Sequence, residues 1–202
     1  MKKIMFNDKY GLTDAVLSGR KTQTRRIIPS ADHTNSWLEG TLVITDKKGC
    51  KQIMAQFSDK RVLSAYAIGE VVAIAQAYRD FFRFCGLTER GIKELKQNPG
   101  WNNKMFVKPS LMPHHIRITN VRVERLQDIS DKDCLAEGIN TFTLPQTEEQ
   151  LYSYRPMKLG MNSRYVFPTS EDAYVALIDK VSGRGTWDAN PYVFVYEFEL
   201  VD

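Results

Sequence analysis

The sequence predicts an α+β fold built on a small β-barrel with short helices packed outside it. Three observations favour this class. Several segments alternate apolar and polar residues as strands do, short helix-like segments separate them, and no strict strand–helix–strand repeat runs along the chain. The length of 202 residues suits one domain, which we place at 1–202, with insertions at about 80–112 and 140–168.

The first half of the chain predicts two helices and three strands. Residues 10–19 place apolar side chains at helical spacing, and Gly19 suits the position that ends a helix. Residues 41–55 predict a β-hairpin with its turn at 46–49. Residues 69–78 predict a strand with small side chains on one face and larger ones on the other, an asymmetry that suits a closed or strongly curved sheet. Residues 87–97 predict a polar surface helix.

The second half predicts a bent strand, two capped helices and a closing strand. Apolar and polar residues alternate over 115–124, and the phase slips by one at Asn120, which predicts a β-bulge. A short helix follows, with Ser130 as N-cap and Gly138 at its end. Residues 140–168 show no clear period and are expected to form a long loop.

The segment 169–183 gives the clearest helix pattern, with Thr169 or Ser170 as cap and Gly183 as the stop. Its apolar stripe consists of Tyr174, Leu177, Ile178 and Val181. The segment 191–201 predicts a closing strand by its alternation. The inward-facing residues of that strand are expected to be Phe194, Tyr196, Phe198 and Leu200.

The composition is that of an ordinary globular chain with a slight positive charge. Hydrophobic residues make up 43% and charged residues 26%, so a core of normal size is expected. The net charge of +4 suits a polyanionic partner without requiring one. No apolar run approaches the roughly 20 residues that span a membrane, and we expect no membrane partner and a cytoplasmic location.

No cofactor or metal ion is expected. The three cysteines, Cys50, Cys85 and Cys134, lie far apart without a CxxC pair, so we expect buried, inert thiols. His114 and His115 are adjacent on a strand, so their side chains point opposite ways and do not share a metal. Neither a GxGxxG segment nor a phosphate-binding loop is present.

The segment "GRKTQTRR" carries the first candidate chemistry. Lys21 and Thr24 are three residues apart and reach one cleft if the chain turns tightly after Gly19. A lysine acts as a base or nucleophile only if its pKa falls well below about 10.4. Burial lowers it, as do neighbouring cations such as Arg25 and Arg26. Residue types alone favour the alternative of a solvated basic turn.

Glu137 is the second candidate, because it lies in the last turn of the predicted short helix. The negative end of the helix dipole disfavours a charged carboxylate there, which suits a general acid/base near neutral pH. The alternative is an ordinary surface glutamate beside a helix end.

A third candidate region combines basic and aromatic side chains, as single-stranded nucleic acid requires. Its residues are Trp101, Lys104, Phe106, Lys108, Arg117, Arg122 and Arg125. Outward arginines are common on strands, so the indication is weak. Trp187 is expected to pack in the core or at a rim, and a rim position also allows stacking on a base.

Taken together, these segments resemble the ASCH family of the PUA-like superfamily. "GRKTQTRR" is similar to its G-x-K-x-x-T-x-R motif, through Gly19, Lys21, Thr24 and Arg26. "YAIGEVVAI", "CLAEGI" and "GTWDANPYVFVYEFE" follow in the order of the family. The chain also resembles a long subgroup of the family that is common in phages and prophages.

This resemblance implies a small β-barrel flanked by helices and a nucleic-acid or nucleoside ligand. One bacterial branch of the family consists of N(4)-acetylcytidine amidohydrolases that use a Lys, a Thr and a Glu. Their counterparts here are Lys21, Thr24 and Glu137. This chain is about twice as long as that branch, and its insertions are placed to reshape a cleft.

Three functions follow as expectations. The first is an amidohydrolase with Lys21, Thr24 and Glu137 as catalytic residues. The second is a non-catalytic module that binds RNA, and the third is a phage accessory protein in the host cytoplasm that contacts another protein. The residues expected to bind substrate or RNA are Arg20, Thr22, Arg25, Arg26, Trp101, Lys104 and Trp187.

Overall fold

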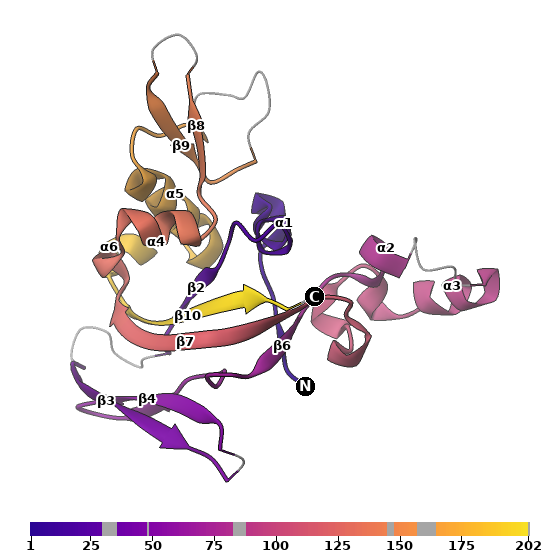
Figure 1. Ribbon diagram of the computed structural model, residues 1–202, viewed down its shortest axis with the longest axis horizontal. Helices are drawn as coiled ribbons and strands as arrows, with labels where there is room; N and C mark the ends of the chain where they lie inside the picture. Colours follow the sequence, from indigo (N-terminus) through magenta and orange to yellow (C-terminus); the bar gives the residue numbers. More distant parts are fainter. Residues whose placement is uncertain (30–35, 48, 83–87, 145–147, 157–164, 202) are drawn as a thin grey trace.

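The computed structural model describes residues 1–29, 36–47, 49–82, 88–144, 148–156 and 165–201. Within these ranges the fold is α+β, with ten strands in three sheets and six α-helices (Figure 1). The predicted fold class is confirmed at this level. Strand pairing leaves the three sheets separate among the described residues, and the closed barrel stays a prediction.

A five-stranded central sheet organises the molecule. Its strands, in spatial order, are β1 (Lys3–Ile4), β6 (Val71–Ile74), β7 (His115–Arg125), β10 (Tyr192–Leu200) and β2 (Gln23–Ile27). β1 pairs parallel to β6, and the other neighbours pair antiparallel. β2 therefore forms one edge of this sheet.

The predicted bulge in β7 is confirmed. Glu197 of β10 is paired with Asn120, but the next residue, Phe198, is paired with Ile118, so Thr119 is the extra residue. The phase slip keeps Ile118 and Val121 buried on either side of the bulge.

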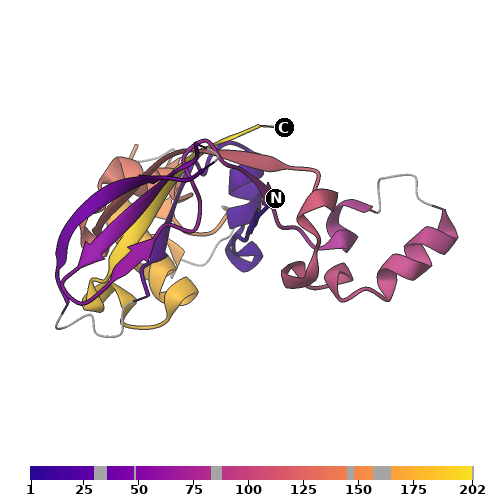
Figure 2. The ribbon, with the colours of Figure 1, turned by 90° about the horizontal axis from the view of Figure 1, so that it is seen from below.

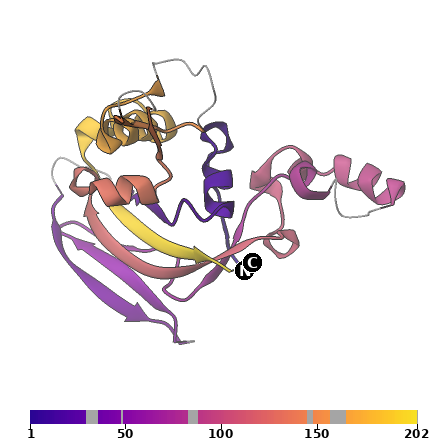
Figure 3. The ribbon, with the colours of Figure 1, turned by 45° about the horizontal axis from the view of Figure 1, so that its top comes forward.

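A three-stranded sheet lies on one side of the central sheet (Figures 1 and 3). It consists of β3 (Leu38–Thr45), β4 (Lys51–Phe57) and β5 (Arg61–Leu63), with β3 at its edge. The predicted hairpin turn is confirmed, because Gly49 N–H donates to the Asp46 carbonyl at 3.0 Å.

Helices cover the opposite face of the central sheet (Figures 1 and 3). These are α4 (Asp131–Ala136), α5 (Ser170–Ser182) and α6 (Thr186–Ala189), while α1 (Leu12–Leu17) lies beside β2. The predicted caps Ser130 and Thr169 both accept a backbone N–H.

The described residues 78–82 and 88–112 form a helical unit that projects from the sheets (Figure 2). It contains α2 (Tyr78–Phe81), the predicted polar helix α3 (Glu89–Lys96) and three short 3-10 turns. The strand expected over 69–78 ends at Ile74, and both of its faces are buried. The alanine face packs in the small core of this unit, with Tyr78, Trp101, Val107 and Met112.

The expectation of a long loop over 140–168 is wrong for its first part. β8 (Asn140–Thr143) and β9 (Gln150–Ser153) pair antiparallel into a hairpin that contacts α5. Residues 145–147 and 157–164 of the predicted loop lie outside the described residues.

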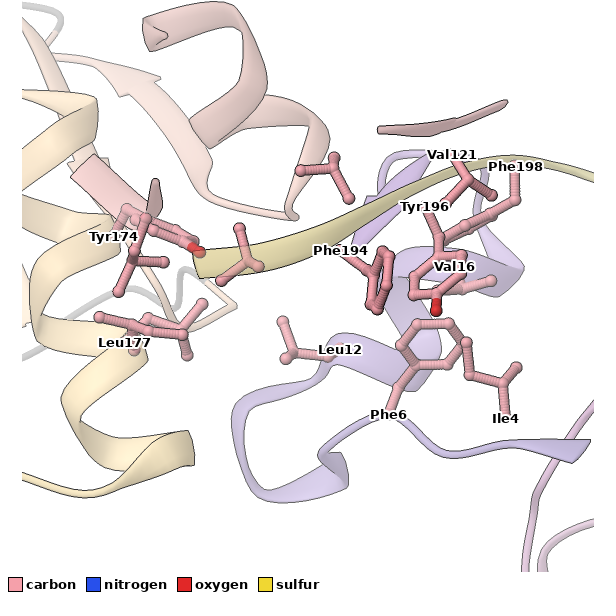
Figure 4. Close-up of a cluster of buried hydrophobic side chains, with 14 of the residues drawn as sticks. Ile4, Phe6, Leu12, Val16, Val121, Tyr174, Leu177, Phe194, Tyr196 and Phe198 are labelled. Atoms are coloured by element: carbon pink, nitrogen blue, oxygen red, sulfur yellow. The ribbon is translucent and has the colours of Figure 1, made fainter. Parts of the chain in front are cut away.

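The main core lies between the sheets and the helices. Figure 4 shows part of it where α1, α5 and β10 meet, with Phe6, Phe194, Tyr196 and Phe198 gathered on one side. Tyr174 and Leu177 reach this core from α5, as the helical stripe predicts. Leu200, expected to face inward, is 38% exposed because it ends β10, and Val181 is also exposed at the end of α5.

Candidate active site

A cavity of about 330 Å³ lies where α1, β2, α5 and the residue after α4 come together. Its polar lining residues are Asn7, Lys21, Thr24, Arg25, Arg26, Glu137, Tyr174 and Ser182. Apolar side chains of α1 and α5, among them Leu12, Leu177 and Ile178, complete the wall. The volume is at the lower end of the range of roughly 300–1,000 Å³ that is usual for small-molecule sites.

The local chain path explains how two distant segments meet here. After α1 the chain turns through Gly19 at φ +73°, as predicted, and Lys21 N–H donates to the Ala15 carbonyl at 2.8 Å. Thr22 N–H then donates to the Ala136 carbonyl at 2.9 Å. The segment before β2 is thus joined to the end of α4, which places Lys21 beside Glu137.

Gly138 ends this turn in a backbone conformation that favours glycine. Its φ of +102° lies in the region that glycine favours, and a Cβ there would lie 3.4 Å from Lys21 Cβ. A Cβ would thus be in ordinary contact with the lysine stem, and the cost of a larger residue would come from the backbone conformation.

Lys21 and Glu137 form a buried ion pair. Lys21 Nζ donates to Glu137 Oε2 at 2.6 Å and to the carbonyls of Glu137 and Gln23 at 2.7 Å each. The two side chains are 2% and 7% exposed. All three ammonium hydrogens therefore have acceptors, and the basic turn expected from residue types alone is not solvated at Lys21.

The pKa of Lys21 is lowered. Burial is the main cause, because it penalises the charged ammonium, and the nearby Arg26 and Arg25 act in the same direction. The Glu137 carboxylate opposes this shift without cancelling it. The direction is the one that a catalytic lysine needs.

Arg25 is fully enclosed by carboxylates. Its guanidinium donates to Glu124 at 3.0 and 2.6 Å, to Asp133 at 3.0 Å and to Glu137 at 3.2 Å. Burial alone would lower the pKa of Arg25, but the carboxylates of Glu137 and Glu124 outweigh it and the pKa is raised. Arg25 was expected to bind substrate or RNA. Arg25 lines the cavity and holds Glu137 through Oε1, while Lys21 holds it through Oε2, and the expected binding role stays a prediction.

Thr24 and Arg26 belong to the edge strand β2. Thr24 is buried and lines the cavity, and no hydrogen bond joins its hydroxyl to Lys21 or Glu137 in the described part of the chain. Arg26 is exposed, donates to the Met5 carbonyl, and lines this cavity and two neighbouring hollows.

Tyr174 is a cavity residue that the sequence indicates only as part of an apolar stripe. Its side chain is 1% exposed, and its hydroxyl has no hydrogen-bond partner among the described residues. Burial raises the pKa of Tyr174 well above its ordinary value, so the hydroxyl keeps its proton. A buried hydroxyl without a partner costs about 1–3 kcal/mol, and an acceptor in the cavity would recover this energy.

The other predicted binding residues are dispersed. Arg20 and Thr22 are exposed next to the cavity, and Arg20 donates to the Gly138 carbonyl. Lys104 lines a neighbouring hollow, where its ammonium donates to the Phe6 carbonyl and to Asp8. Trp187 packs edge-on against Tyr174, with ring centroids 6.3 Å apart.

The residues of the predicted basic and aromatic surface differ in their surroundings. Phe106 and Lys108 are exposed, as a binding surface requires. Trp101 packs in the core of the helical unit and lines a small hollow there with Phe82 and Ile92, and its expected binding role stays a prediction. Arg117 pairs with Glu199, while Arg122 pairs with Glu124, Asp133 and Glu197. Arg125 stacks on Tyr192, with its guanidinium carbon 3.8 Å from the ring centroid.

The thiols follow the sequence expectation in part. Cys134 is buried, and burial raises its pKa to about 12. Cys50 is only half-buried, because it follows the β3–β4 turn, and Cys85 lies outside the described residues. The described residues contain no group of three His, Cys, Asp or Glu side chains placed to hold a metal ion. Nor do they contain a helix long and apolar enough to cross a membrane.

Comparisons of the chain with protein-family models, with curated proteins and with solved structures return no match.

Proposed function

We propose that the protein is an ASCH-type amidohydrolase that removes the acyl group from an N-acylated cytidine-like nucleoside or base. The observation that carries this proposal is the Lys21–Glu137 contact of 2.6 Å on the wall of a cavity that Thr24 also lines. These are the three residues that the family resemblance implies.

The reaction begins with a proton shift inside the ion pair. Lys21 passes one ammonium proton along its hydrogen bond to Glu137, giving a neutral amine and a carboxylic acid. The lowered pKa of Lys21 favours this step. The amine then takes the proton of the attacking hydroxyl, from Thr24 or from water, as that oxygen bonds to the amide carbon.

Bond cleavage restores the pair. As the carbon–nitrogen bond breaks, Glu137 gives its proton to the departing amine, and Lys21 keeps the proton taken from the hydroxyl. Where Thr24 is the nucleophile, water releases the acyl group from its oxygen in a second step. The sum is amide plus water giving a carboxylic acid and an amine.

The Tyr174 hydroxyl is the donor that the amide oxygen needs as it gains negative charge. It is protonated, buried and without another partner among the described residues. Arg26, which lines the same cavity, supplies positive charge. The apolar side chains of Leu177 and Ile178 suit the faces of a base.

The same proposal includes a PUA-like barrel made of the central and three-stranded sheets. The two sheets share one apolar core, in which Phe57 of β4 contacts Tyr192 of β10 with ring centroids 5.3 Å apart. A bridge between Lys51 and Ile68 links the three-stranded sheet to the segment before β6. A substrate of this class would be met in the cytoplasm, which is the location expected from the sequence.

The test is release of cytidine from N(4)-acetylcytidine. We expect turnover by the wild type and none by Lys21→Met, which keeps the length of the buried stem. Lys132→Ala removes an exposed lysine of α4 and is the matched control, with turnover unchanged. Absence of wild-type turnover, or equal turnover by Lys21→Met, contradicts the proposal.

A second candidate is an RNA-binding module without catalysis. The exposed side chains of Arg20, Thr22 and Arg26 beside the cavity favour it. It predicts salt-dependent binding of single-stranded RNA that Arg20→Ala and Arg26→Ala weaken, with no turnover of the acylated nucleoside. Binding that salt does not change counts against this second role.

A further inference from the structure

Strand β3 is an apolar edge that no described strand covers. It pairs with β4 on one side only, and seven of its eight residues are exposed. Leu42, Val43 and Ile44 at its centre are 48%, 60% and 38% exposed. Long apolar edge strands are rare on isolated domains, since their free backbone groups pair readily with another strand.

One face of this sheet carries an apolar row that leads to the edge. Leu63 of β5, Met54 of β4 and Leu42 of β3 are aligned across the three strands. Leu63 is 45% exposed and Met54 is half-buried. The row stops at β3, where a further strand would continue it.

We propose that a second copy of this chain pairs antiparallel with β3 about a two-fold axis at Val43. Each Val43 then faces Val43 of the partner subunit, and Leu42 faces the partner subunit's Ile44. The next pair outward joins Thr41 to Thr45 of the partner subunit, so the regular part of β3, from Thr41 to Thr45, is paired along its whole length. An axis at Leu42 would instead set Ile44 opposite Gly40, and an axis at Ile44 would set Leu42 opposite Asp46. Only the axis at Val43 pairs all three exposed apolar residues with one another, so the strand is complementary to a second copy of itself.

The dimer joins two three-stranded sheets into one of six strands. It extends the apolar row across the axis and uses the free backbone groups of both edges. The catalytic cavity lies on the helical side of the central sheet, away from β3 (Figure 1). The proposal is therefore independent of the function proposed above.

Disulfide trapping in a Cys50→Ser background tests the register. Paired residues of antiparallel strands lie about 4.5–5.5 Å apart at Cα, which a disulfide spans. Val43→Cys is expected to form a covalent dimer on mild oxidation. Thr45→Cys is the matched control on the same face. Its two copies lie about 13 Å apart in this register and do not cross-link.

Sedimentation of the wild type and of Val43→Lys tests the interface without cysteines. We expect a wild-type dimer and a dissociation constant raised about tenfold or more by Val43→Lys, which replaces two buried valines at the axis by like charges. The exposure of Val43 in one copy means that the variant still folds. A monomeric wild type, a dimer that Val43→Lys leaves unchanged, or equal cross-linking of the two cysteine variants overturns the proposal.

Discussion

Replacing Tyr174 by phenylalanine removes one oxygen and is expected to act in opposite directions on stability and on catalysis. The ring is held by the α5 core and by the edge contact with Trp187, which phenylalanine retains. The hydroxyl, in contrast, is buried without a partner in the described part of the chain. The hydroxyl therefore makes no hydrogen bond in the described residues that would stabilise the protein without a ligand.

The expected changes in unfolding free energy and in kcat follow from the fact that this hydroxyl is buried and unpaired among the described residues. An unpaired buried hydroxyl costs about 1–3 kcal/mol, so we expect the unfolding free energy of Tyr174→Phe to rise by about 1 kcal/mol. As the donor to the developing oxyanion, the same hydroxyl is expected to be worth about 10²–10³ in kcat, as single donors of this kind are elsewhere.

Urea unfolding and steady-state kinetics with N(4)-acetylcytidine measure the two effects. Tyr196→Phe is the matched control, because its hydroxyl is also buried but accepts the Ala65 N–H at 2.8 Å. That variant is expected to lose about 1 kcal/mol of stability and to keep its turnover. A destabilised Tyr174→Phe with unchanged kcat would refute this reasoning.

Three further predictions concern stability. Arg25→Met leaves the surrounding carboxylates without their buried cation and should lower the unfolding free energy by about 3–5 kcal/mol. Arg90→Ala breaks an exposed pair and should cost less than about 0.5 kcal/mol in the same urea titration. The pKa of Cys134 is about 12 in the fold, against an ordinary 9.0, so the folded thiol keeps a proton that the unfolded chain loses. Wild-type stability should therefore fall from pH 9 towards 12, and less steeply in Cys134→Ala. Gly138→Ala should cost about 1–2 kcal/mol by thermal unfolding, because φ there is +102°.

Each of these has a clear contrary result. Equal losses for Arg25→Met and Arg90→Ala would mean that the buried carboxylates need no cation. Parallel pH profiles for the wild type and Cys134→Ala would show that the thiol titrates alike in both states. An unchanged melting temperature for Gly138→Ala would mean that alanine adopts the backbone conformation at this position without strain.

The elements that the sequence predicts well have strong local signals. The cap residues Ser130 and Thr169 and the left-handed Gly19 act within a few residues of themselves, so their effect is visible in a short stretch. The shift by one residue in the apolar–polar alternation at Asn120 is likewise visible within a few residues, and it predicts the bulge in β7. In contrast, the β8–β9 hairpin has no clear period, and its contacts with α5 come from the tertiary structure.

The site could be predicted only in part, because its geometry joins distant residues. Lys21 and Glu137 are separated by 116 positions, and the family resemblance, not the local pattern, paired them. The ion pairs of Arg25 could not be predicted, because its carboxylate partners lie 99 to 112 residues away in the sequence. Tyr174 belongs to the apolar stripe of its helix, and that pattern does not show whether its hydroxyl takes part in binding or catalysis.

The measurement that tests the central claim most directly is a double-mutant comparison of kcat/KM for N(4)-acetylcytidine. The variants are Lys21→Met, Glu137→Gln and the two combined, each checked for folding by thermal unfolding. If Lys21 and Glu137 work as one proton-transfer unit, the combined variant loses no more activity than the worse single variant. Losses that multiply in the combined variant, or a wild type without turnover, would contradict the account.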